Sequence, residues 1–101
     1  MKGGFSSFAE EELSDILSLD EFLIGNPSAT FLVKVSGDSM IHDGIFPGDF
    51  VVAERGRSPK NGDIVIVQIE GEWTMKKFSS LAPPKGLSIA AVVTASFRKY
   101  R

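Results

Sequence analysis

A serine lies on a short glycine-containing turn, in the stretch SGDSM at residues 36–40. Gly, Asp and Ser are ordinary turn residues, so the turn alone is compatible with a purely structural role. A serine hydroxyl becomes an effective nucleophile when a neighbouring base takes its proton. If Ser39 is a nucleophile, the chain must therefore supply that base.

His42, the only histidine of the chain, lies three residues after Ser39. Its neighbours are turn-like and polar, and no carboxylate is spaced to orient it in a triad. We therefore interpret His42 as a surface loop residue. Because the chain has one histidine and no cysteine, it lacks the ligands of a thiolate or histidine metal cluster, and we predict neither a metal nor a cofactor.

A lysine can also serve as the base, but only its free amine accepts a proton. Burial favours the free amine, because desolvation penalises the ammonium. The base should therefore lie in apolar sequence. Three lysines in charged or polar loops fail this test: Lys60, Lys85 and Lys99. Lys34 in FLVKVS and the pair Lys76-Lys77 in WTMKKF pass it.

Strand alternation leaves the choice between the two paired lysines open. On a strand, Lys76 would share a face with Thr74 and Phe78, whereas Lys77 would share the other face with Trp73 and Met75. If the Trp-Met face is the core, Lys77 points inward; otherwise Lys76 does. The pattern is also compatible with two exposed lysines at the end of a strand.

The elements that would position these residues are mostly strands. After Pro27, runs rich in β-branched and aromatic residues are separated by glycine-containing turns. They are TFLVKV (30–35), DFVVAE (49–54), DIVIVQIE (63–70), EWTMKKF (72–78) and the final run GLSIAAVVTASF. Glu70-Gly71 is short enough to join two of them as a hairpin. The pairs Gly48-Asp49 and Gly62-Asp63 are interpreted as structural turns that open strands.

The first 26 residues have helical features instead. Ser7 with Glu10 and Ser18 with Glu21 have capping-box spacing, and Gly25-Asn26-Pro27 ends the helical pattern. Phe22, Leu23 and Ile24 make the second segment apolar enough to dock. We therefore predict a single domain over 1–101, with a short helical N-terminal arm (1–26) and a β core (27–101).

Composition narrows the class of protein. A 101-residue chain with 43% hydrophobic and 24% charged residues is typical of one globular domain. Its net charge of −2 gives no general electrostatic reason to bind nucleic acid. The start of the chain lacks the apolar region of a signal peptide, and no apolar run is long enough to span a membrane. The sequence therefore favours a cytoplasmic protein without a membrane partner.

These residues together carry a resemblance. The stretch from Asn26 to Phe78, with PSATFLVKVSGDSM, DGIFPGD and NGDIVIVQIEGEWTMKKF, resembles the peptidase domain of the LexA/UmuD family, and is most similar to its UmuD branch. The resemblance covers about half the chain. It implies a fold of packed antiparallel sheets.

The resemblance also implies residue roles. In that family the serine of the S-G-x-S-M motif is the nucleophile, which corresponds to Ser39, and the first lysine of the late pair is the base, which corresponds to Lys76. Lys34 and Lys77 are then flanking residues. The backbone N–H groups of Ser39 and Met40 would hold the developing oxyanion.

The family's substrate is its own N-terminal arm, cut at a bond between a small residue and glycine. GGFSS resembles that site, with Gly3-Gly4 in the scissile position, so the chain is expected to be the processed form. Relatives carry further strands between the lysine pair and the last strand, where this chain has only SSLAPPKG. Missing strands would reduce the burial of Lys76.

The function implied by the resemblance is SOS mutagenesis. A RecA filament would stimulate self-cleavage, and the processed homodimer would join an error-prone DNA polymerase subunit in translesion synthesis, without sequence-specific DNA binding of its own. Three alternatives stay open: the peptidase domain of a LexA-like or phage repressor, a signal-peptidase-like enzyme, and a non-catalytic dimer module with a vestigial dyad. The first two would need a DNA-binding domain and a membrane anchor, respectively.

Overall fold

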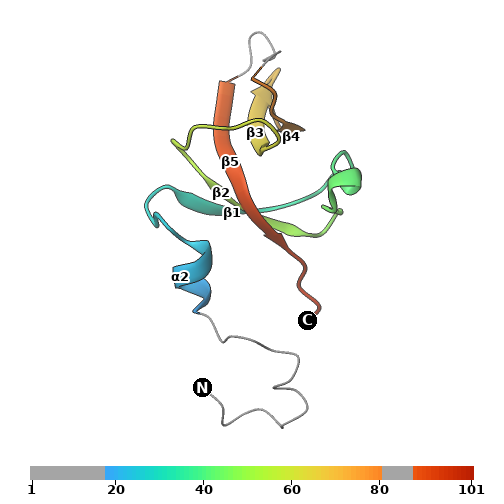
Figure 1. Cartoon of the computed structure of the whole chain (residues 1–101). Helices are drawn as coiled ribbons and strands as arrows, with labels where there is room; N and C mark the ends of the chain where they lie inside the picture. Colours follow the sequence, from blue (N-terminus) through green and yellow to red (C-terminus); the bar gives the residue numbers. More distant parts are fainter. Residues whose placement is uncertain (1–17, 81–87) are drawn as a thin grey trace, which may run out of the picture.

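The computed structural model describes residues 18–80 and 88–101, which form mostly antiparallel β-structure (Figure 1). The strands are β1 (Thr30–Lys34), β2 (Phe50–Glu54), β3 (Ile64–Ile69), β4 (Glu72–Lys77) and β5 (Ser88–Phe97). One short helix, α2 (Leu19–Leu23), precedes them, and a 3-10 helix, η1 (Ile41–Asp43), lies between β1 and β2. The prediction of a mostly-β fold is confirmed. Neither of the described stretches contains a helix that is long and apolar enough to cross a membrane.

The helix α2 confirms one predicted cap and corrects one packing expectation. The Ser18 side chain accepts a hydrogen bond from the Glu21 N–H, as the capping-box spacing predicts. However, α2 has no buried residue, and Phe22 is 70% exposed. The expectation that this segment docks is therefore met only in part: Leu23 is partly covered and lines a pocket with Phe31 of β1, whereas Phe22 does not. The predicted cap at Ser7 lies outside the described residues.

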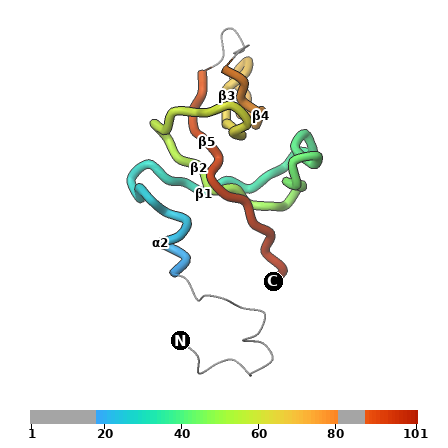
Figure 2. The backbone as a smooth tube through the Cα atoms, in the orientation of Figure 1, coloured from blue at the N-terminus to red at the C-terminus, as the bar shows by residue number. Residues whose placement is uncertain are grey.

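The five strands form one sheet in the order β1-β2-β5-β3-β4. The long strand β5 lies at its centre and joins two strand pairs (Figure 2). The first half of β5 pairs with β3, and its second half pairs with β2. In consequence β1 and β4, the strands that lead into Ser39 and into the lysine pair, are the two edges of the sheet.

Two irregularities bend the centre of this sheet. The register shifts between Val52 and Ala53 where β2 meets β5, and between Ile66 and Val67 where β3 meets β5. An extra residue on one strand of an antiparallel pair bends that strand and increases its twist. The bends are consistent with a curved sheet, in which Val33 of one edge strand and Met75 of the other pack against the same core residues.

The hairpin predicted at Glu70-Gly71 is confirmed. The register of β3 and β4 ends at the pair Ile69 and Glu72, which leaves a two-residue loop. Both loop residues have positive φ, 51° at Glu70 and 84° at Gly71, as a type I′ turn requires. The turn fixes the register that places Lys76 opposite Val65 and Lys77 opposite Ile64.

Buried side chains lie on both faces of the sheet. Residues of β3 show this by alternation, because Val65 and Val67 pack in a cluster with Val92, whereas Ile66 packs with Ala53 and Ala91. A third cluster extends the Ile66 side toward the Ser39 loop and contains Val35, Met40, Ile45 and Val51. The loop that carries Ser39 is thus anchored in the core by the residue next to it.

Candidate functional site

Two Gly-Asp turns of the same design fix the ends of the strands that lead to the candidate residues. In the first, the Asp49 N–H donates to the Phe46 carbonyl, and the Phe46 N–H donates to Asp49 Oδ2. In the second, Asp63 and Lys60 exchange the same two hydrogen bonds. Gly48 and Gly62 have φ of 91° and 90°, which favours glycine. The structural role predicted for both pairs is confirmed.

Each turn also holds the residue that follows an edge strand. Val35, which follows β1, donates to the Asp49 carbonyl at 2.8 Å and accepts from the Gly48 N–H at 2.8 Å. Phe78, which follows β4, donates to the Asp63 carbonyl at 2.7 Å and accepts from the Gly62 N–H at 3.0 Å. The turns therefore fix the chain just before the Ser39 loop and just after the lysine pair.

The first turn is reinforced by the C-terminal segment. Asp49 is buried, at 4% exposure, and accepts hydrogen bonds from Arg98 Nε at 2.8 Å and Nη2 at 3.3 Å. The Arg98 guanidinium also lies 5.0 Å from the centre of the Phe46 ring. The hydrogen bond from the Arg98 guanidinium, followed by the one from the Phe46 N–H, holds the pKa of Asp49 below its ordinary value of 3.8. Arg98 thus clamps the turn beneath the Ser39 loop.

We expect Asp49→Asn to lower the free energy of unfolding at about pH 7, because it removes the charge that Arg98 pairs with. The folded-state pKa of Asp49 is lowered, so its stabilisation is present above the unfolded-state pKa and is lost as the pH falls through the folded-state value. Urea unfolding at neutral pH and at about pH 3 should therefore show the gap between wild type and variant closing in acid.

Asp63→Asn is the matched control, since its turn makes the same backbone bonds and Asp63 has no guanidinium partner among the described side chains. A gap between wild type and Asp49→Asn that stays constant down to about pH 2 would contradict this account of Asp49.

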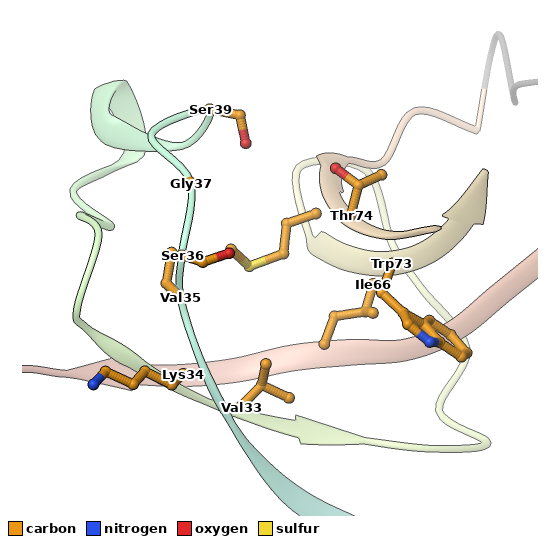
Figure 3. A pocket seen from close by; sticks show the side chains of 10 residues that line it. Val33, Lys34, Val35, Ser36, Gly37, Ser39, Ile66, Trp73 and Thr74 are labelled. Carbon is orange, nitrogen blue, oxygen red and sulfur yellow. The ribbon is translucent and has the colours of Figure 1, made fainter. Parts of the chain in front are cut away.

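Ser39 borders a cavity of about 190 Å³ between the end of β1 and β4. Figure 3 shows Ser39 and Thr74 at one end, and Val33, Ile66 and Trp73 at the other. Lys34 is one of the three lysines that the sequence analysis kept as candidate bases, and its side chain points away from the cavity. The cavity has an apolar floor and hydroxyl groups at its rim, a composition suited to holding a peptide chain near a nucleophile.

The backbone around Ser39 offers the donors expected of an oxyanion site. The Ser39 and Met40 N–H groups donate to no acceptor within the described ranges. The Met40 side chain is 5% exposed and packs in the core, whereas Ser39 is exposed. Two free N–H groups next to an accessible hydroxyl can stabilise an oxyanion that forms on a carbonyl at that hydroxyl.

The two adjacent lysines of β4 have different surroundings. Lys77 shares the face of Met75 and donates from Nζ to Asp43 Oδ1 at 2.7 Å, so it reaches η1 in the Ser39 loop. Lys76 is exposed, lies on the opposite face beside Val65, and makes no hydrogen bond with Ser39 in the part of the chain that the structure describes. The structure therefore brings Lys77, and not Lys76, to the loop directly.

The position of Thr74 bears on the reach of Lys76. Thr74 and Lys76 are two residues apart on an edge strand and so share one face. Nevertheless Thr74 lines the cavity together with Ser39 (Figure 3). The face of β4 that carries Lys76 is thus accessible from the cavity at Thr74, two residues before Lys76.

Sequence reasoning missed Asp43 and Arg98. Their partners are 34 and 49 residues away along the chain, so no local spacing signals either pair. The only sequence feature that could point to Asp43 or Arg98 is that each is a charged residue beside a predicted turn or strand end. The remaining predicted site residues, Gly3 and Gly4, lie outside the described residues.

Comparison of the sequence with known proteins shows the family to which the chain belongs. The family model described as Peptidase S24-like matches residues 1–90. The chain is 41% identical over 76 residues to protein ImpA of Salmonella typhimurium, a match that covers 75% of this chain and 52% of ImpA. It is 38% identical over 74 residues to the LexA repressor of Anaeromyxobacter dehalogenans, covering 73% of this chain and 32% of the repressor.

A third relative matches almost the whole chain. Protein SamA of Salmonella typhimurium is 37% identical over 112 residues, which cover 97% of this chain and 80% of SamA. The aligned stretch is longer than the 101 residues of this chain, so SamA has residues without a counterpart here. The chain spans about half the length of the ImpA proteins it matches.

Proposed function

Because this chain belongs to the Peptidase S24-like family, we propose that it is a LexA/UmuD-type protein whose Ser39 and Lys76 cut the chain's own N-terminal arm. The observation that supports the proposal best is Ser39, exposed at a cavity beside β4 and next to two N–H groups that have no acceptor among the described residues. Of the two adjacent lysines of β4, Lys77 is paired with Asp43, whereas Lys76 has no carboxylate partner among the described residues.

The proposed reaction is an acyl transfer followed by hydrolysis. Ser39 Oγ attacks the carbonyl carbon of Gly3 while the Lys76 amine takes the hydroxyl proton. The N–H groups of Ser39 and Met40 hold the oxyanion. As the bond between Gly3 and Gly4 breaks, Lys76 gives the proton to the Gly4 nitrogen, and water then releases the acyl group from Ser39.

The exposure of Lys76 bears on how the reaction is controlled. A lysine base must be neutral, and a low-dielectric environment favours that form. We propose that this cover comes from the docked arm or from a second copy of the chain, since β4 is an edge strand of the sheet that residues 18–80 and 88–101 form, and an edge strand can pair with a further segment. A filament of RecA that stimulates cleavage would act by favouring the docked arm.

The proposed cellular role is in the SOS response to DNA damage, in the cytoplasm. The processed chain would form a homodimer and join an error-prone DNA polymerase subunit in translesion synthesis. SamA matches 97% of this chain, against 73% for the LexA repressor, and this longer match favours that role over a repressor. A non-catalytic dimer module is the second candidate, and the exposed position of Lys76 favours it.

One experiment separates the two candidates. A form of the chain with a longer arm before Gly4 is incubated in alkaline buffer, or at neutral pH with a RecA filament, and its mass is followed. We expect a new N-terminus at Gly4 and a cleavage rate that rises with pH, because a larger fraction of the base is then free amine. An arm that stays intact in both conditions would favour the non-catalytic module.

A further inference from the structure

We propose that the ion pair between Lys77 and Asp43 is a positioning device that holds the Ser39 loop against β4. Lys77 Nζ and Asp43 Oδ1 are 2.7 Å apart, although 34 residues separate them in sequence. The inference rests on the proposed function only in so far as Ser39 is the nucleophile. Lys77 would then be a positioning residue, while Lys76 is the base.

The loop has few other anchors. It leaves the sheet at Val35 and returns at Gly48, the two residues that the first Gly-Asp turn joins. Between them the side chains of Met40 and Ile45 are buried in the core, whereas η1 has no buried residue and no side-chain cap. Asp43 is the C-terminal residue of η1, so its bond to Lys77 ties the exposed part of the loop to β4.

Backbone hydrogen bonds link Asp43 to Met40, the residue next to Ser39. The Asp43 N–H donates to the Met40 carbonyl at 3.0 Å, and the Ile45 N–H donates to the same carbonyl at 3.1 Å. Gly44 closes η1 with φ of 82°, a conformation that favours glycine. A displacement of Asp43 would therefore move Met40, whose N–H is a proposed oxyanion donor, together with its neighbour Ser39.

The arrangement also separates the tasks of two adjacent lysines. An ammonium donates hydrogen bonds and accepts none, so Lys77, while it is bound to Asp43, is unsuited to take the Ser39 proton. Alternation along β4 then directs the neighbouring amine to the other face, where no described carboxylate pairs with it. One lysine fixes the geometry and the next remains available for proton transfer.

The first test is hydrogen exchange of the chain itself, which does not depend on activity. Lys77→Ala should raise the exchange rates of the Asp43, Gly44 and Ile45 amides by about two- to fivefold, the range of an exposed ion pair. The Asp63 amide, in the second Gly-Asp turn, should keep its rate. Unchanged exchange at the Asp43, Gly44 and Ile45 amides would overturn the proposal, whatever the activity of Ser39.

The second test is a double-mutant cycle on the cleavage rate of the arm-extended chain. Lys77→Ala and Asp43→Ala should each lower the rate about two- to tenfold, and the double variant should be no slower than either single one. Lys77→Arg should keep most of the rate, because it can still pair with Asp43. Losses that simply add would contradict coupling between the two residues.

The chain provides a matched control pair. Arg57 and Glu54 are joined at 3.1 Å with side-chain exposures of 56% and 20%, against 58% and 26% for Lys77 and Asp43. Glu54 pairs with Thr30, at the end of β1 remote from the Ser39 loop. Arg57→Ala should leave cleavage unchanged, and an equal loss there would assign the effect of Lys77 to general stability. If the wild-type arm is never cut, the proposed function fails while the exchange experiment still decides whether the pair holds the loop.

Discussion

Replacing Ser39 by alanine should abolish cleavage of the arm-extended chain. Removal of the nucleophile of a serine peptidase lowers the rate by about 10⁴-fold or more, because no other group in the site can form the acyl intermediate. The measurement is the fraction of chain cut at Gly3-Gly4 over time, by mass spectrometry. Ser39 makes no side-chain hydrogen bond within the described residues and is exposed, so the variant should keep its fold.

Two controls make the Ser39 result specific. Ser36→Ala removes another hydroxyl that lines the same cavity and should cut at close to the wild-type rate. The free energy of unfolding of Ser39→Ala should differ from that of the wild type by no more than about 0.5 kcal/mol, as for other exposed positions. A Ser39→Ala chain that still cuts its arm would show that the nucleophile is elsewhere.

Replacing Lys76 by alanine should lower the cleavage rate by about 10²- to 10⁴-fold, the contribution of a positioned general base. Lys76→Arg should be as inactive, because the guanidinium keeps the positive charge but accepts no proton. The wild-type rate should rise with pH, and the residual rate of the Lys76→Ala chain should lose that dependence on the amine. The measurement is the first-order rate of arm cleavage across a pH series.

The adjacent lysine is the decisive comparison. Lys77→Ala should lose only the two- to tenfold expected of a positioning residue, and should keep the pH dependence of the wild type. Because the structure places Lys77 in contact with the Ser39 loop, the comparison tests directly whether Lys76 or Lys77 is the base. An inactive Lys77→Ala chain beside an active Lys76→Ala chain would exchange the roles of the two residues.

Most of the strand framework is predictable because its signals are local. The run at residues 49–54 and the Gly48-Asp49 turn before it depend on β-branched residues, glycine and a short-range carboxylate bond. The structure places β2 at Phe50–Glu54 with that bond present. The same reasoning finds the hairpin at Glu70-Gly71, where two residues of positive φ fit the two-residue spacing.

The parts that were not predictable depend on long-range contacts. Phe22 is expected to dock because it is apolar, yet α2 has only five residues, none of them buried, and Phe22 is exposed. Alternation correctly pairs Lys77 with the Met75 face, but only the curvature of the sheet decides which face meets the Ser39 loop. That curvature follows from register shifts along β5, which the sequence does not signal.

The most direct test of the Ser39–Lys76 proposal is to map the reaction of the chain with a fluorophosphonate, which bonds to an activated serine oxygen as fluoride leaves. This measurement needs no arm, because it is made in alkaline buffer, in which a larger fraction of a lysine base is free amine without the cover of a docked arm. The account predicts that peptide mapping finds the label on Ser39, at similar rates in the wild type and in Lys77→Arg, and that Lys76→Ala is labelled at least about 100-fold more slowly. A wild-type chain that remains unlabelled at Ser39, or a Lys76→Ala chain labelled as fast as the wild type, would contradict the dyad.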